Sequence, residues 1–185
     1  MPNTIHSRSP TSDVARYSLL ALLLTSVHHA YGAFIYSTPW RLHVVFVTGT
    51  AALIILGALA VQRAHLSDKV GTAARWLFVA VVLAVPILFF GVFEGFYNHV
   101  LKDVLFYAGL PTNEMVRLFP PPRYEMPNDA FFEITGVLQV VPSALAARHL
   151  YRLLADSHRI DERPNRPASP TRERNHSEED AHVTI

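Results

Sequence analysis

The sequence predicts an all-α fold: an integral membrane four-helix transmembrane bundle with a short interfacial helix in its third loop. Half of the 185 residues are hydrophobic, and the mean hydropathy is positive. The apolar residues fall into four blocks bounded by charged residues, which is typical of membrane-spanning helices. The sequence has no cysteine, which excludes disulfides and thiolate metal sites. Its net charge of +1 gives no electrostatic basis for binding nucleic acid.

Each block is long enough to cross a bilayer at about 1.5 Å per helical residue. The four blocks run from about Tyr17 to Trp40, Leu42 to Val61, Trp76 to Tyr97 and Ala130 to Ala147. The first is too long for a signal-peptide core and no clear cleavage motif follows it, so we expect a retained helix. The second is rich in small residues that suit close helix contact. Pro86 marks a candidate kink in the third.

Polar segments flank this membrane region at both ends of the chain. The first residues are rich in serine and proline, and the last thirty or so hold few apolar side chains. Segments of such composition cannot bury enough apolar surface to fold alone. We therefore predict a disordered N-terminal segment over residues 1–15, a transmembrane domain over 16–152 and a disordered polar tail over 153–185.

Lysine and arginine residues near the block ends predict the orientation. They gather in the second connection and after the fourth block, at Arg63, Lys69, Arg75, Arg148, Arg152, Arg159 and Arg163. An excess of these residues marks the cytoplasmic side of a membrane helix. We therefore expect a multi-pass protein of the cell membrane with both termini cytoplasmic and the first and third loops outside.

The third loop, from His99 to Asp129, is too long to be a simple connector. Apolar and charged residues alternate over Leu101–Tyr107, which predicts a short amphipathic helix on the membrane surface. The proline run in Leu118–Tyr124 is typical of a stiff, extended segment. A lid over the outer mouth and a surface-packed linker both remain open. Asp129 or Asn128 is expected to cap the fourth helix.

Ionisable side chains inside the blocks are the strongest functional signal. Each costs roughly 2.5–3.5 kcal/mol at membrane depth, so such residues tend to share a site. The blocks contain His28, His29, Glu94 and Glu133, with His43 and His99 at their edges. Under the predicted orientation all six lie between mid-depth and the outer surface. We predict that they line one hydrated pocket, with Glu94, His29 and Glu133 as the catalytic candidates.

Helical geometry refines this prediction. Glu94 shares an α-helical face with Asn98, four residues on, whereas His99 points about 140° away and need not share its site. His28 and His29 point about 100° apart, so both binding one ion is awkward. Asn98 and His99, like His43, are therefore supporting candidates. Thr135 and Gln139 are expected to form interhelical hydrogen bonds.

Three kinds of chemistry suit imidazole and carboxylate groups in this setting. His28, His29, Glu94 and Glu133 can bind a divalent transition metal ion. The same groups can exchange protons with a substrate, or relay protons along a transport path. Haem ligation by two histidines on different helices is a further option that no spacing singles out.

The run Glu94-Gly-Phe, followed by Arg123-Tyr124 and Glu133, resembles the membrane isomerase superfamily that includes emopamil-binding protein. In that family, intramembrane carboxylates and histidines transfer protons on a sterol. The resemblance covers these few residues, and it implies that such chemistry is feasible in a helix bundle of this kind.

Three functions remain open at this stage. The first is a His/Glu site open to the outer face, with or without a metal, that acts on a lipid-soluble substrate or on protons. The second is a non-enzymatic subunit: Gly91 and Gly95 form a small-residue face that would pack on a second copy or on a larger membrane complex. The third is a small proton-coupled carrier.

Overall fold

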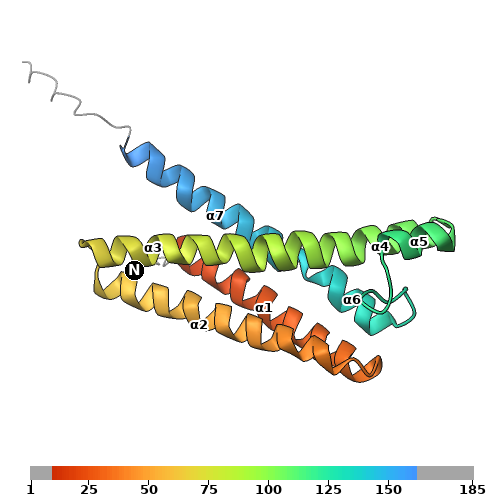
Figure 1. Ribbon diagram of the computed structural model, residues 1–185. Helices are drawn as coiled ribbons and strands as arrows, with labels where there is room; N and C mark the ends of the chain where they lie inside the picture. Colours follow the sequence, from red (N-terminus) through yellow and green to blue (C-terminus); the bar gives the residue numbers. More distant parts are fainter. Residues whose placement is uncertain (1–9, 162–185) are drawn as a thin grey trace, which may run out of the picture.

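The computed structural model describes residues 10–161, and over this range the chain is helical without a β-strand. Long helices lie side by side as an elongated bundle (Figure 1). The elements are α1 Pro10–Ile35, η1 Pro39–Leu42, α2 His43–Ala64, α3 Lys69–Val82, η2 Leu83–Leu101, α4 Lys102–Tyr107, α5 Thr112–Leu118, α6 Ala130–Leu138 and α7 Val140–Asp161. Residues 1–9 and 162–185, which include most of both predicted disordered ends, lie outside the described range.

Four helices are long and apolar enough to cross a membrane, as the four blocks predict. They comprise Pro10–Ile35, Pro39–Ala64, Lys69–Tyr107 and Ala130–Asp156. Helix α1 packs against α7 and α2, and α2 packs against α3. Many large apolar side chains, such as Phe46 at 76 % exposure, face outward. This distribution suits a bundle surrounded by lipid.

An apolar core fills the half of the bundle nearest the α2–α3 turn. Its members are buried side chains such as Val14, Leu22, Ile55, Phe78 and Phe90. Beyond Leu22 the buried face of α1 turns polar, and Thr25 donates a hydrogen bond of 2.6 Å to Gln139 between α6 and α7. The bundle therefore divides along its length into an apolar part and a polar part.

Several helix ends differ from the predicted ones. Helix α1 begins at Pro10 rather than near Tyr17, and α7 continues to Asp161, so residues 10–15 and 153–161 are helical. The fourth span is interrupted at Gln139 between α6 and α7. Pro142, which follows closely, lacks an N–H and clashes with a carbonyl four residues earlier, which explains the break. Asp129 caps α6 by accepting a hydrogen bond of 2.8 Å from the Phe132 amide, as predicted.

The residues of the predicted surface helix over Leu101–Tyr107 are helical, but they continue the third long helix, as the last residue of η2 and as α4 (Figure 1). From Phe96 to Ala108 the sequence has no glycine or proline, and Gly109, which has a φ of +82°, ends the helix. The Gly109 and Leu110 amides donate to the carbonyls of Phe106 and Leu105, the hydrogen-bond pattern of a glycine C-cap. The short helix of this loop is instead α5, at Thr112–Leu118.

Pro86 lies in a π-helical segment, η2, and α3, η2 and α4 form one continuous rod without a sharp bend (Figure 1). A proline kink arises from the α-helical relation between residue i and the carbonyl of i−4. The i→i+5 hydrogen bonds of a π-helix change that relation. The predicted kink is therefore absent.

The Gly91/Gly95 face packs within the chain. A Cβ atom at Gly91 would collide with Ser143, and one at Gly95 would lie 3.0 Å from Val140. Helix α7 therefore already occupies the face that the sequence offered to a second copy or a partner complex.

Candidate functional site

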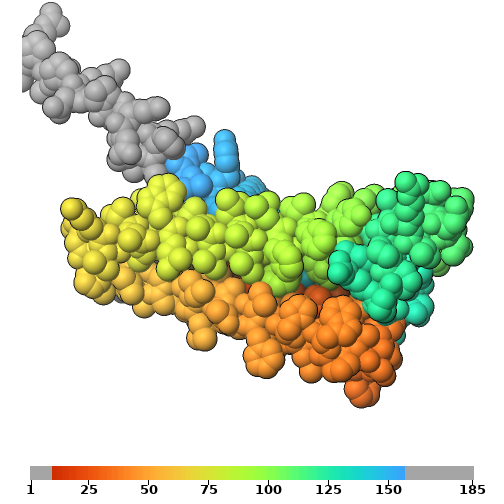
Figure 2. Space-filling model, in the orientation of Figure 1, coloured from red at the N-terminus to blue at the C-terminus, as the bar shows by residue number. Residues whose placement is uncertain are grey.

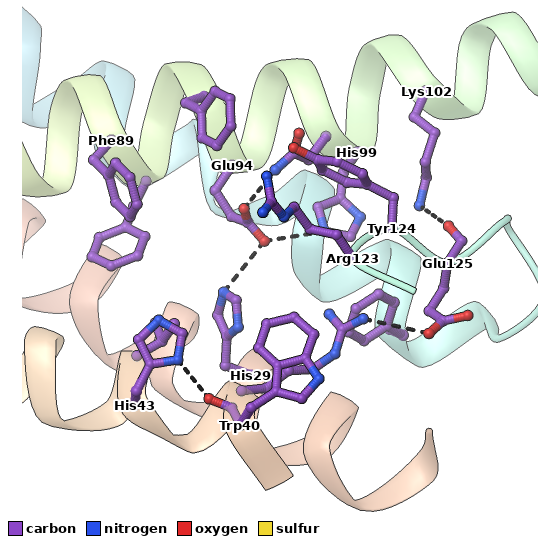
Figure 3. Close-up of a pocket in the computed structure, with 16 residues that line it drawn as sticks. His29, Trp40, His43, Phe89, Glu94, His99, Lys102, Arg123, Tyr124 and Glu125 are labelled. Carbon is purple, nitrogen blue, oxygen red and sulfur yellow. Dashed lines mark hydrogen bonds and ion pairs between the residues drawn. The ribbon is translucent and has the colours of Figure 1, made fainter. Parts of the chain in front are cut away.

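A cluster of buried polar side chains, here called the polar cluster, lies at the end of the bundle away from the α2–α3 turn. Figure 3 labels His29, Glu94, His99 and Lys102 among its members. Helix α1 supplies two members, η2 three, and α4 and α6 one each. The members are His28, His29, Glu94, Asn98, His99, Lys102 and Glu133. The structure thus brings together five of the six ionisable residues that the sequence singled out.

Three imidazoles face one oxygen of Glu94. The Nε2 atoms of His29, His99 and His28 lie 3.3, 3.9 and 4.0 Å from Glu94 Oε1. The His28 side chain is fully buried, and Glu94 keeps only 14 % of its side chain exposed. The other oxygen of Glu94 accepts a hydrogen bond of 2.7 Å from the Asn98 amide, which orients the carboxylate.

Hydrogen bonds fix the tautomer of His28. Its Nδ1 lies 3.0 Å from the Thr135 hydroxyl, and that hydroxyl donates its own proton to the Phe131 carbonyl at 2.8 Å. Thr135 can therefore only accept from His28, so we assign the proton to Nδ1. The Nε2 atom, which faces Glu94, then carries a lone pair and has no hydrogen-bond partner.

His99 has the same tautomer for a different reason. Its Nδ1 lies 2.8 Å from Glu133 Oε2, and an ionised carboxylate can only accept. Lys102 Nζ donates to the other Glu133 oxygen at 3.1 Å and to the Glu125 carbonyl at 2.8 Å. Lys102 therefore balances the charge of Glu133 and leaves the charge of Glu94 without a cation of its own.

The atoms that converge are those that a metal ion uses. His28, Glu94 and His99 each offer one ligand atom, and these atoms lie within 4.8 Å of one another. Tetrahedral ligands at about 2.0–2.2 Å from an ion are roughly 3.5 Å apart. The distances from Glu94 Oε1 to Nε2 of His28 and to Nε2 of His99 would therefore each shorten by about half an ångström on metal binding. The carboxylate behind His99 matches the carboxylate–histidine pairs that orient metal ligands.

The prediction that His99 need not share a site with Glu94 is wrong, since their side chains lie 3.9 Å apart. The angle of about 140° holds for an α-helix. In η2 the hydrogen bonds run from i to i+5, which brings residues five apart to the same side of the axis. Two other candidates do not face Glu94. Glu133 contacts the opposite side of the His99 ring, and His43 is exposed and hydrogen-bonded to the Trp40 carbonyl.

A cavity of about 260 Å³ borders the polar cluster. It is bounded by η1, the start of α2, η2, α4 and the loop before α6, whose surfaces meet on the face shown in Figure 2. Its lining residues are His29, Trp40, Arg41, His43, Val44, Phe89, Phe90, Phe93, Glu94, Asn98, His99, Lys102, Arg123, Tyr124, Glu125 and Phe132. Burial in this wall raises the pKa of the Tyr124 phenol.

Sequence reasoning missed Arg41, Lys102 and the orienting role of Thr135. Lys102 was placed in a surface helix, but an unbroken helix puts it three residues from His99 on a shared face. The absence of a breaker before Gly109 was the signal that could have placed it. The predicted interhelical hydrogen bonds of Thr135 and Gln139 are confirmed.

Replacing Gly136 by alanine is expected to displace His99. A Cβ atom at Gly136 would collide with the imidazole, whose two nitrogens face Glu94 and Glu133. The ring cannot move without losing that alignment, so we expect the affinity for a metal ion that His28, Glu94 and His99 would hold to fall by about 10–100-fold, as when an orienting group is lost. Gly57→Ala is the matched control, since nothing lies within 4 Å of its Cβ. Equal affinity in the two variants, measured by metal titration, would contradict the assigned position of His99.

Comparison with known proteins gives no match to a family model, a curated protein or a solved structure.

Proposed function

We propose that this chain is an integral membrane protein that binds one divalent transition metal ion in the extracytoplasmic half of its bundle. The ligands are Nε2 of His28, Nε2 of His99 and the carboxylate of Glu94. One observation carries the proposal: two imidazole lone pairs and a carboxylate oxygen converge in a buried place. Electron-pair donors without a hydrogen between them repel one another, and a cation removes that repulsion.

The surroundings support a metal rather than a structural ion pair. A salt bridge would place a lysine or arginine against Glu94, but Lys102 is held by Glu133. In both imidazole ligands the Nδ1 atom is hydrogen-bonded, in His28 to Thr135 and in His99 to Glu133, as in metal-binding histidines. His29 lies 3.3 Å from Glu94 in the cavity wall, beside the three ligands and outside the ligand set.

The cavity gives this centre an enzymatic rather than a purely structural character. Catalytic zinc sites have three protein ligands and one open position, whereas structural sites are closed. Here Glu94 and His99 line the cavity, so an ion beside them would be reached by a substrate. A bound metal would supply a Lewis acid there. Asn98, Thr135 and Glu133 hold the ligands in place, and the apolar wall selects a lipid-soluble substrate.

The orientation follows from the charge pattern. Lys69 begins α3 beside Arg63, at the end of the bundle away from the polar cluster, and this end is cytoplasmic under the positive-inside rule. The cavity then opens on the outer side. The alternative of a non-enzymatic subunit that binds a partner through the Gly91/Gly95 face is less favoured, because this face packs on α7.

Metal analysis of the purified protein tests the proposal. The protein would be extracted in detergent without chelators, and its metal content would be measured by mass spectrometry. We expect about one transition metal ion per chain, with cobalt reloading after chelation to give a spectrum of a nitrogen- and oxygen-ligated ion. His43→Asn, a change outside the ligand set, should leave both results unchanged. A metal-free protein that also fails to take up cobalt, zinc, manganese or iron would refute the metal site.

A further inference from the structure

The cavity beside the polar cluster opens sideways between α2 and η2. Helix α1 packs against both of these helices, whereas α2 makes its main contacts with α3 and α1 rather than with η2. Val44 of α2 lines the cavity together with Phe89 and Phe93 of η2. Phe89 and Phe93 are 50 % and 41 % exposed. A molecule dissolved in the surrounding lipid would reach the cavity through this apolar opening without crossing water.

Arg41 lies at the polar end of the same cavity with part of its guanidinium unused. The residue is 4 % exposed, and its Nη2 atom forms an ion pair of 3.5 Å with Glu125 Oε1 but makes no hydrogen bond. The guanidinium is held over the rings of Trp40 and Phe132 at 4.9 and 5.5 Å, and its Nε donates to Thr38. A buried guanidinium fixed by aromatic rings with a free donor is suited to an anionic oxygen ligand.

The cavity wall carries charges of both signs. Its cationic side chains are Arg41, Lys102 and Arg123, and its carboxylates are Glu94 and Glu125. Lys102 is committed to Glu133, but Arg123 is exposed at the rim, where it can approach a ligand that Arg41 holds.

The volume limits what fits. About 260 Å³ corresponds to roughly nine water molecules at about 30 Å³ each. Pockets that enclose drug-sized ligands measure about 300–1,000 Å³. The cavity therefore holds a head group and the first few carbons of a chain, and the remainder must lie outside, along the exposed apolar surface of α2 and η2.

We propose that this cavity binds a single-chain amphiphile by its anionic head, a carboxylate or a phosphate, which contacts Arg41 and Arg123 while the acyl chain leaves between α2 and η2. The inference rests on the proposed function in one respect, since the head then lies beside the His28–Glu94–His99 group. It names the substrate class of that site as anionic lipids with one chain.

The test measures binding of a fluorescent fatty acid to the full chain in nanodiscs of uncharged lipid. Oleate, oleyl phosphate, oleyl alcohol and inorganic phosphate compete for the site. We expect oleate and oleyl phosphate to displace the probe at least about ten-fold more strongly than oleyl alcohol, because a hydrogen bond to a charged group exceeds a neutral one. In Arg41→Gln this preference should fall to about two-fold, whereas Arg63→Gln, at the other end of the bundle, should keep it.

Two results would overturn the proposal. Equal displacement of the probe by oleate and by oleyl alcohol would show that the charge of the head group does not contribute to binding. Displacement by inorganic phosphate as strong as by oleyl phosphate would show a site for small anions instead. If Arg41→Gln does not fold, Arg123→Gln on the exposed loop provides the same comparison. Metal content is measured on the same samples, so a metal-free protein that still prefers oleate separates failure of the metal site from failure of this inference.

Discussion

Replacing Glu94 by glutamine is expected to abolish binding of a transition metal ion at physiological concentrations. The substitution keeps the size and the hydrogen-bonding group that Asn98 contacts, but it removes the negative charge that faces three imidazoles. Changing an outer group that merely orients a ligand costs about 10–100-fold in metal affinity. Loss of the only anionic ligand should therefore cost more than about 100-fold.

Competition titration against a chelator of known affinity measures this loss, together with the metal content of the purified variant. Glu114→Gln on α5 removes a carboxylate that does not line the cavity, and it serves as the control. Glutamine is neutral, so the variant also removes the unfavourable burial of an unbalanced charge, and its thermal stability without metal should be equal to or above that of the parent chain. A glutamine variant with one metal ion per chain and unchanged affinity would show that Glu94 is not a ligand.

The arrangement of the helices was largely predictable because it depends on composition along the chain. Bilayer thickness sets the length of an apolar span. Four apolar blocks bounded by charged residues therefore predict four long helices, even when the exact ends of the helices are uncertain from sequence. The ends were less predictable. Leu101–Tyr107 has an amphipathic pattern, but its backbone had no reason to leave the helix before Gly109.

The membership of the polar cluster was predictable from the cost of charge in an apolar environment, whereas the role of each member was not. The expected depth of His28, His29, Glu94 and Glu133 in the membrane was enough to predict that they lie close together. The place of His99 beside Glu94 depends on the π-helical backbone of η2, which no residue pattern used here indicates. The different roles of the two carboxylates depend on Lys102. Because Lys102 lies beside Glu133, Glu133 orients His99, whereas Glu94 faces the imidazole lone pairs.

Replacing Lys102 by methionine is expected to cause the largest loss of stability in the bundle. Lys102 and Glu133 are 2 % and 7 % exposed, and Lys102 Nζ lies 3.1 Å from the carboxylate. Removing one partner of a buried ion pair leaves an uncompensated charge, which costs about 3–5 kcal/mol. The free energy of unfolding, measured by denaturation in mixed micelles, should fall by that amount. Lys69→Met, at an exposed position, should change it by no more than about 0.5 kcal/mol.

The double variant Lys102→Met/Glu133→Leu separates stability from function. With both charges replaced by apolar groups of similar size, most of the lost stability should return, because a buried ion pair is seldom better than a well-packed apolar pair. Metal affinity should be about 10–100-fold below that of the parent chain, since His99 then lacks the carboxylate that fixes its tautomer. A double variant with restored stability and full metal affinity would mean that Glu133 only balances Lys102. Restored stability with reduced metal affinity would support the role of Glu133 in holding His99 toward Glu94.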